Sequence, residues 1–162
     1  MSNNQYNIIH PSFKHGLRFS IGNYCIIEEN VIIKNDAKIE SYVYIKSYTN
    51  IGHHVFIDSY VRFSGYSKIG NHCTIRYGAT IARNVIINNH VFISPQVMTI
   101  YTQPHSIIKK PIIINTGAYI GTAAVIGSGV TIGKNVIIGA CTYVNRDCME
   151  GTWAGVPAKR IK

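Results

Sequence analysis

The sequence predicts an all-β fold, a parallel β-helix that coils as a single domain over residues 1–162. Three observations lead to this prediction. A large apolar residue recurs every six positions, and a small or β-branched residue follows each of them four positions later. In addition, 29 isoleucines and 12 valines stand against a single leucine, Leu17. Because β-branched side chains lose rotamer freedom in helices and fit strands well, this composition disfavours helices.

The six-residue period runs without a slip through residues 21–98 and resumes over residues 114–149. The first positions of the nineteen repeats are Ile21, Ile27, Ile33, Ile39, Ile45, Ile51, Ile57, Phe63, Ile69, Ile75, Ile81, Ile87, Ile93, Ile114, Ile120, Ile126, Ile132, Ile138 and Val144. A fixed period of this kind is typical of repeat architectures. We expect first and fifth positions to point inward and three repeats to form one triangular coil, which gives a little over six coils.

The remaining positions of each repeat carry residues that suit tight corners. Second positions are often Gly, and fourth positions are often Asn, His, Asp or Gly, which tolerate left-handed backbone conformations. Fourth positions 18 residues apart should stack on one edge of the prism. The expected stacks are Tyr24, Tyr42 and Tyr60; Tyr48 and Tyr66; and Asp36, His54, His72 and His90.

Three segments fall outside the regular repeats. We interpret residues 1–20 as an N-terminal cap and residues 150–162 as a C-terminal tail, because the open ends of a solenoid need covering. Residues 99–113, TIYTQPHSIIKKPII, interrupt the period and are predicted to form an extruded loop. Long loops in compact domains are often functional, and His105 lies at the centre of this one.

The distribution of charge and the spacing of the cysteines limit the classes of partner and site that we expect. The net charge is +9 and the pI about 9.5, and no Asp or Glu occurs between Ser59 and Arg146. This stretch should attract anions such as phosphate-bearing small molecules. Nucleic acid is not expected, because no aromatic-basic motif or recognition helix accompanies the charge. The four cysteines show no CxxC spacing, so a zinc ribbon or thiol redox site is not indicated.

Two features of the sequence bear on location. It has no apolar run of about 18 residues, so no membrane span is expected. The opening MSNNQYNIIHPSF lacks the basic-then-apolar layout of a signal peptide. We therefore expect a cytoplasmic protein that does not bind membranes.

The period and the C-terminal segments together resemble the hexapeptide-repeat acyltransferases, whose fold is a left-handed β-helix. The resemblance extends over about residues 9–160 and is carried by TGAYIGTAAVIGSGVTIGKNVIIGACTYVNRD followed by GTWAGVPAKRIK. It implies acetyl-CoA as co-substrate and a homotrimer with the pantetheine arm between neighbouring subunits. The implied cofactor contacts are Tyr119, Gly121, Thr122, Ala123, Gly139 and Ala140, with Asn145, Arg146, Lys159 and Arg160 near the CoA phosphates.

Two branches of this superfamily compete. The stretch IRYGATIARNVIINNHVFISPQVMTIYTQPHS is similar to N-acetyltransferases that act on nucleotide-linked amino sugars of surface glycans, and we favour this activity. The motif IYTQPH instead resembles the maltose and galactoside O-acetyltransferases, whose loop ends in a catalytic histidine. Thr74 and Ala82 stand where that second branch commonly has its sugar-contacting Asn and Asp.

His105 is the expected general base, because a neutral imidazole near pH 7 can take the proton of an attacking sugar group. A sugar hydroxyl needs such help more than a sugar amine does. Substrate contacts are assigned to His72, Arg76, Tyr77 and Tyr101. No covalent acyl-enzyme is required, and a backbone N–H near Gly121 or Gly139 is a candidate oxyanion donor.

Two other functional classes remain open from the sequence. One alternative is a metalloenzyme resembling the γ-class carbonic anhydrases. It rests on the expected spacing of about 4.8 Å between successive rings of His54, His72 and His90 on one edge. The column lacks a nearby second carboxylate or thiolate, so no metal is expected. The other class is a non-catalytic β-helical scaffold. The predicted loop and the C-terminal tail argue against it.

Overall fold

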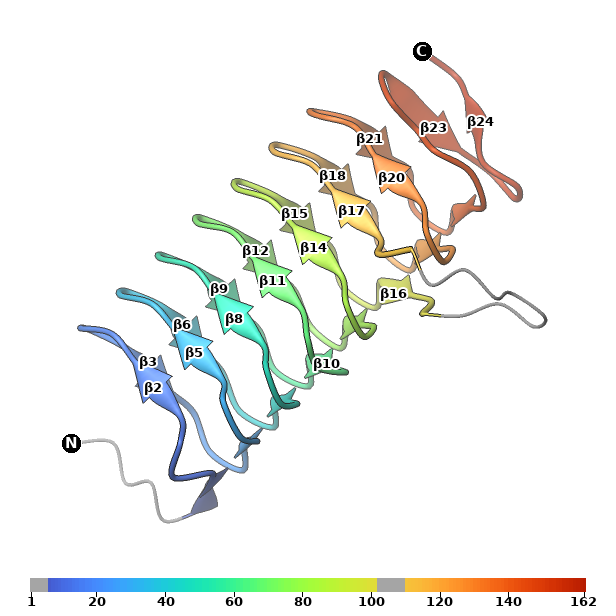
Figure 1. The fold of residues 1–162 in the computed structure, drawn as a ribbon. Helices are drawn as coiled ribbons and strands as arrows, with labels where there is room; N and C mark the ends of the chain where they lie inside the picture. Colours follow the sequence, from blue (N-terminus) through green and yellow to red (C-terminus); the bar gives the residue numbers. More distant parts are fainter. Residues whose placement is uncertain (1–5, 102–109) are drawn as a thin grey trace.

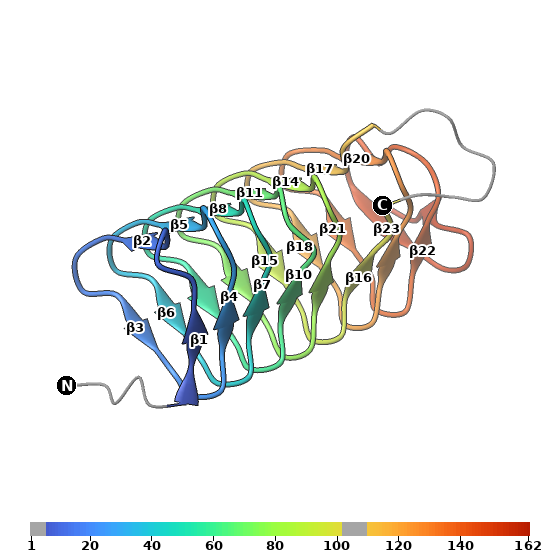
Figure 2. The same ribbon diagram turned by 60° about the horizontal axis from the view of Figure 1, so that its bottom comes forward.

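A computed structural model describes residues 6–101 and 110–162 of the chain. In this described part, 24 strands of two or three residues each form three sheets. Successive coils stack along one axis from the N-terminal to the C-terminal end, and the three sheets form the sides of the stack (Figures 1 and 2). The predicted parallel β-helix is therefore confirmed.

From β1 to β22 the chain visits the three sheets in rotation, and β23 and β24 then both join sheet C. Sheet A contains β1 (Ile8–Ile9), β4 (Ile26–Ile27), β7 (Tyr44–Ile45), β10 (Arg62–Phe63), β13 (Thr80–Ile81), β16 (Met98–Thr99), β19 (Val125–Ile126) and β22 (Tyr143–Val144). Sheet B contains β2 (Lys14–His15), β5 (Ile32–Ile33), β8 (Asn50–Ile51), β11 (Lys68–Ile69), β14 (Ile86–Ile87), β17 (Ile113–Ile114) and β20 (Thr131–Ile132). Sheet C contains β3 (Ser20–Ile21), β6 (Lys38–Ile39), β9 (Phe56–Ile57), β12 (Thr74–Ile75), β15 (Phe92–Ile93), β18 (Tyr119–Ile120), β21 (Ile137–Ile138), β23 (Thr152–Ala154) and β24 (Lys159–Arg160).

The first coil replaces the expected N-terminal cap. Residues 6–20 supply β1, β2 and the start of β3, and they pair in parallel with the next coil at the 18-residue offset of the repeats, as in Ile8↔Ile26 and Lys14↔Ile32. Their backbone hydrogen bonds continue the ladder, so Phe13 and Phe19 occupy ordinary fifth positions despite their size. Sheet A has eight strands, which makes about eight coils rather than the six counted from the unbroken repeats.

The core is the interior of the prism. Among the nineteen first positions of the repeats, every residue except Ile21 is buried, and so is every fifth position. The residue before each first position points outward, as in the pair Ile137, which is 45% exposed, and Ile138, which is fully buried. The inward orientation predicted from the period is thus confirmed.

The three edges of the prism are named for the sheets that they join. Edge AB follows the sheet A strands, edge BC follows sheet B and edge CA follows sheet C. In every repeat except the last, the fourth position lies at a corner and has positive φ, between 54° and 63° at residues such as Tyr24, His54 and Tyr60. These corners stack as predicted: ring centroids are 5.1 Å apart for Tyr24 and Tyr42 and 4.7 Å apart for His54 and His72.

The interruption of the repeats adds residues to one coil without disturbing the coils on either side. Across it, paired strands are 27 positions apart instead of 18, as in Ile86↔Ile113. Thr99 stays in β16, and its hydroxyl accepts the backbone N–H of Ala82 at 2.7 Å. The carbonyl of Ile112 accepts the N–H of Ile86. Thr99 and Ile112 therefore both belong to the ladder, on either side of the interruption.

The C-terminal tail lies across the last coil. Strand β23 pairs in parallel with β21, and β24 returns antiparallel to β23. Ala158 is buried, and its N–H donates to the carbonyl of Tyr143 at 2.8 Å. Within residues 6–101 and 110–162, no helix has the length and apolar character required to cross a membrane.

Candidate functional site

Edge CA gathers half of the predicted cofactor residues in its last coils. Gly121, Thr122 and Ala123 form one corner, and Gly139 and Ala140 begin the corner of the next coil directly against it. A Cβ on Gly121 would lie 2.6 Å from the backbone nitrogen of Ala140, so this position requires glycine. The adjacent side chains are equally small. The result is a corner on which backbone rather than side chain faces outward.

At some comparable corners, a side chain of the following coil caps the backbone N–H of the second corner residue. On edge BC the Oδ1 of Asn71 accepts the N–H of His53 from the preceding coil at 2.8 Å. On edge CA the Oγ of Ser41 does the same for the N–H of Asn23 at 3.1 Å.

The corner residue one coil after Thr122 is Ala140, and its methyl group cannot accept a hydrogen bond. Among the described residues, the N–H groups of Thr122 and Ala140 have no hydrogen-bond partner, although both residues are exposed. One coil earlier, the buried Oγ of Ser94 also lacks a partner within the described chain. Edge CA therefore offers unpaired polar groups beside a surface of small side chains.

The other predicted cofactor residues lie elsewhere. Tyr119 is on sheet C just before this corner, stacked on Phe92 with ring centroids 5.4 Å apart. Asn145 and Arg146 are exposed on edge AB, across sheet A. Lys159 and Arg160 are on β24, where the Arg160 guanidinium binds the carboxylate of Glu150 at 2.6 Å. The tail cations and Arg146 thus do not converge within one chain.

The predicted substrate residues occupy all three edges. Arg76 and Tyr77 lie on edge CA, one coil before Ser94. The Arg76 guanidinium donates to the Asp58 carboxylate at 3.0 Å, and the ring of Tyr77 meets that of Tyr60 edge-on at 5.4 Å. Tyr101 is on edge AB. His72 is on edge BC, within the histidine column, so the chain does not bring it near the other three.

His105 lies outside the described residues. Its flanks are described: the chain leaves edge AB after Tyr101 and returns at Lys110, whose Cβ would be 3.2 Å from a Cβ on Gly129. The segment that carries His105 therefore springs from edge AB, one coil beyond Arg83.

The histidine column on edge BC does not form a metal site. The rings of His54, His72 and His90 stack in parallel, 4.7 Å and 5.0 Å apart with interplanar angles of 8° and 1°, so their nitrogens point side by side. His54 lies 3.8 Å from the carboxylate of Asp36. In the part of the chain that the structure describes, no group of three or more His, Cys, Asp or Glu side chains could hold a metal ion.

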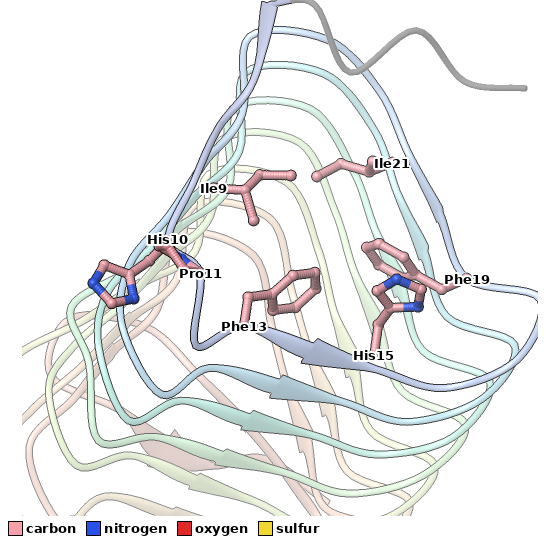
Figure 3. A pocket seen from close by; sticks show the side chains of 7 residues that line it. All are labelled: Ile9, His10, Pro11, Phe13, His15, Phe19 and Ile21. Carbon is pink, nitrogen blue, oxygen red and sulfur yellow. The ribbon is translucent and has the colours of Figure 1, made fainter.

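Two hollows were not foreseen from the sequence. One of about 380 Å³ lies at the open end of the first coil, where Ile9, Phe13 and Ile21 point toward the interior (Figure 3). It is the uncovered core rather than a site near the small-residue corner.

The second hollow, of about 230 Å³, is a groove along edge AB between Glu28 and Arg83. The six-residue period places both residues on edge AB, but it does not predict that their side chains line a groove.

Comparison with known proteins agrees with this architecture. Residues 48–83 match the family model described as bacterial transferase hexapeptide (six repeats). No curated protein sequence matches the chain.

Solved structures with this fold are similar over most of the chain. A UDP-N-acetylglucosamine acyltransferase from Bacteroides fragilis has a TM-score of 0.80 at 19% identity, over 98% of this chain and 72% of its own. A galactoside acetyltransferase in complex with coenzyme A has a TM-score of 0.64 at 27% identity, over 79% and 64%.

A hexapeptide-repeat acetyltransferase from Vibrio cholerae, complexed with acetyl-CoA, has a TM-score of 0.61 at 26% identity, over 68% of each chain. These similarities agree with the family resemblance of the sequence. Two of the three structures contain CoA or acetyl-CoA.

Proposed function

We propose that this protein is an acetyl-CoA-dependent sugar acetyltransferase, and that its acceptor is a nucleotide-linked amino sugar. The hexapeptide repeats and the CoA-bound structural neighbours support the reaction class. The nucleotide-sugar acceptor is supported by the sequence around residues 75–106 and by the UDP-sugar enzyme among the neighbours. Since acetyl-CoA is the proposed donor, we place the reaction in the cytoplasm.

The observation that carries this proposal is the bare corner of edge CA. A pantetheine arm is a thin chain with amide carbonyls, and it needs both room and hydrogen-bond donors. Gly121, Ala123 and Ala140 leave room, and the unpaired N–H groups of Thr122 and Ala140 are donors of the required kind. An unpaired N–H beside a thioester carbonyl also stabilises the oxyanion that develops during attack.

The proposed chemistry is direct transfer. The sugar amine attacks the thioester carbonyl, a C–N bond forms as the C–S bond breaks, and CoA leaves as the thiolate. His105 takes the proton that the amine loses and passes it to the thiolate sulfur, which gives the free thiol. Cys148 is not invoked as a nucleophile, because burial raises its pKa to about 11 and keeps it protonated near pH 7.

The positions of the two halves of the proposed site support a homotrimer. The segment with His105 leaves edge AB, whereas the bare corner is on edge CA, and the face of sheet A separates them. We propose that edge AB of one protomer meets edge CA of its neighbour, so that each site is completed by two chains.

Sugar O-acetylation is the second candidate. It is supported by the motif IYTQPH and by the 27% identity with a galactoside acetyltransferase. The two candidates differ in their need for a base, because a hydroxyl is a far weaker nucleophile than an amine when neither is deprotonated.

The test is release of free thiol from acetyl-CoA in the presence of a panel of nucleotide-linked amino sugars and simple glycosides. Thiol release that depends on one acceptor supports the proposal, and its class of acceptor selects between the two candidates. Ala140→Trp should abolish CoA binding, measured by calorimetry, whereas Thr116→Trp, at the same corner position on edge BC, should not. CoA binding that survives Ala140→Trp would remove the site from edge CA.

A further inference from the structure

The groove on edge AB runs away from the segment that carries His105. Its wall is formed by corner residues of four successive coils, with Glu28 and Glu29 at one end, Ser47 and Tyr66 between, and Arg83 at the other end. Tyr101, where the chain leaves the solenoid, is the next corner residue after Arg83. A molecule lying in the groove would therefore point one end at the proposed catalytic segment.

The end of the groove nearest that segment is cationic. The central carbon of the Arg83 guanidinium lies over the ring of Tyr66, 3.9 Å from its centroid. Among the described residues no carboxylate forms an ion pair with it. Its N–H groups therefore have no carboxylate partner there, and a guanidinium fork matches the paired oxygens of a phosphate.

The far end of the groove carries the carboxylates of Glu28 and Glu29, and Lys46 lines the groove in the next coil. The Glu28 carboxylate accepts hydrogen bonds from the Tyr44 hydroxyl, from the Ser47 N–H at 3.1 Å and from the Ser47 hydroxyl at 2.8 Å. These bonds, led by that of Tyr44, hold the pKa of Glu28 below its ordinary value. Glu29, beside it, is exposed and has no ion-pair partner within the described chain. Carboxylates in this setting accept hydrogen bonds from ribose hydroxyls.

The spacing of the two ends matches one class of ligand. Glu29, Ser47, Gly65 and Arg83 hold the same corner position in successive coils, so three steps of about 4.8 Å separate the first from the last. The total of about 14 Å is on the scale of an extended nucleoside diphosphate. Anion binding at one end and hydroxyl binding at the other suit a diphosphate and a ribose, respectively.

We infer that this groove holds the nucleoside diphosphate part of the acceptor, with the diphosphate against Arg83 and the ribose hydroxyls against Glu29. The inference rests on the proposed function for what is attached to the diphosphate, a sugar that reaches the segment beyond Tyr101. It adds the site and the residues that distinguish a nucleotide-linked acceptor from a free glycoside.

The test is binding of UDP, dTDP and GDP to the purified protein by titration calorimetry, with uridine and inorganic pyrophosphate as partial ligands. At least one nucleoside diphosphate should bind. Arg83→Gln should weaken it about tenfold or more, as loss of a charged hydrogen-bond pair does. Glu29→Gln should weaken the nucleotide but not pyrophosphate. Lys68→Gln, the same charge change in sheet B, should leave all affinities unchanged.

The outcomes separate this inference from the proposed function. If CoA binds and only unphosphorylated glycosides are acetylated, with no nucleoside diphosphate bound, the inference is wrong and the acetyltransferase remains. If nucleotides bind through Arg83 but neither CoA binding nor transfer is found, the groove assignment stands and the proposed function falls. Nucleotide affinity that is equal in Arg83→Gln, Glu29→Gln and the native protein overturns the inference directly.

Discussion

Ala140 lies one coil above Thr122 on edge CA, and its methyl group stands where an acceptor would satisfy the Thr122 N–H. At the equivalent positions of edge BC, Asn71 caps His53 at 2.8 Å and Asn89 caps Asn71 at 2.8 Å. The proposed CoA corner thus lacks a stabilising contact that the solenoid has at these two corners.

Ala140→Asn should therefore stabilise the fold and weaken CoA binding. The new side chain can accept the Thr122 N–H, which adds about 0.5–1.5 kcal/mol to the free energy of unfolding. It also removes a donor and fills the corner. Urea unfolding and calorimetry measure the two effects. Lys134→Asn, which faces Thr116 in the same way on edge BC, should leave CoA affinity unchanged. A drop in stability for Ala140→Asn would refute the missing cap.

The inward and outward positions of one strand should differ sharply in their contribution to stability. Ile138→Ala removes a fully buried side chain and should cost about 2–5 kcal/mol. Ile137→Ala, its neighbour in β21, removes a side chain that is 45% exposed and should cost less than about 1 kcal/mol. Equal losses in denaturant unfolding would contradict the orientation of β21.

The stability of the protein should fall in acid partly through Glu28. Its pKa is lowered mainly by the Tyr44 hydroxyl, so its contribution is complete above the ordinary value of 4.5 and is lost as pH falls through the lower folded value. Tyr44→Phe should reduce the free energy of unfolding at pH 7 by about 1 kcal/mol and by less at pH 3.

Urea titrations at pH 7, 5 and 3 check this dependence on pH. Tyr60→Phe is the matched control, since that tyrosine is exposed and its hydroxyl makes no hydrogen bond within the described chain. If the two variants lose the same stability at pH 7, the bond to Glu28 contributes nothing measurable.

Thiol reagents should distinguish one cysteine from the other three. Cys141 is exposed at the corner of edge CA, whereas Cys25, Cys73 and Cys148 are buried and burial raises the pKa of each. The native protein should release one equivalent of chromophore rapidly from an aromatic disulfide reagent and the rest only on unfolding. CoA should slow the rapid phase. Cys141→Ser should abolish it; a persistent rapid phase would mean that a buried thiol is accessible.

His105→Ala should lower turnover by about 10²–10⁴ without changing the unfolding midpoint, as loss of a general base does. His54→Ala, an exposed histidine on edge BC, is the control and should retain full turnover. The loss should be greater on a hydroxyl acceptor than on an amine. Turnover that is unchanged on both acceptors would remove His105 from the mechanism.

Much of the fold could be predicted from the period alone, because inward isoleucines and tight corners repeat with the coil. The first coil was missed, since Phe13, His15 and Phe19 break the composition of the repeat while keeping its backbone register. For the site, Gly121 and Ala140 could be found through the resemblance. The pairing of Arg160 with Glu150 could not, because it depends on the antiparallel return of β24.

The period of six was enough to predict which side chains point inward and which residues share an edge, because it fixes both once the coil is triangular. Which polar groups are left unpaired could be seen only in the folded chain. The N–H of Thr122 has no partner within the described chain, and Arg83 lies over the ring of Tyr66, because of what the neighbouring coil places beside each of them. Such contacts join residues about 18 positions apart, where spacing sets proximity but side-chain chemistry sets the interaction.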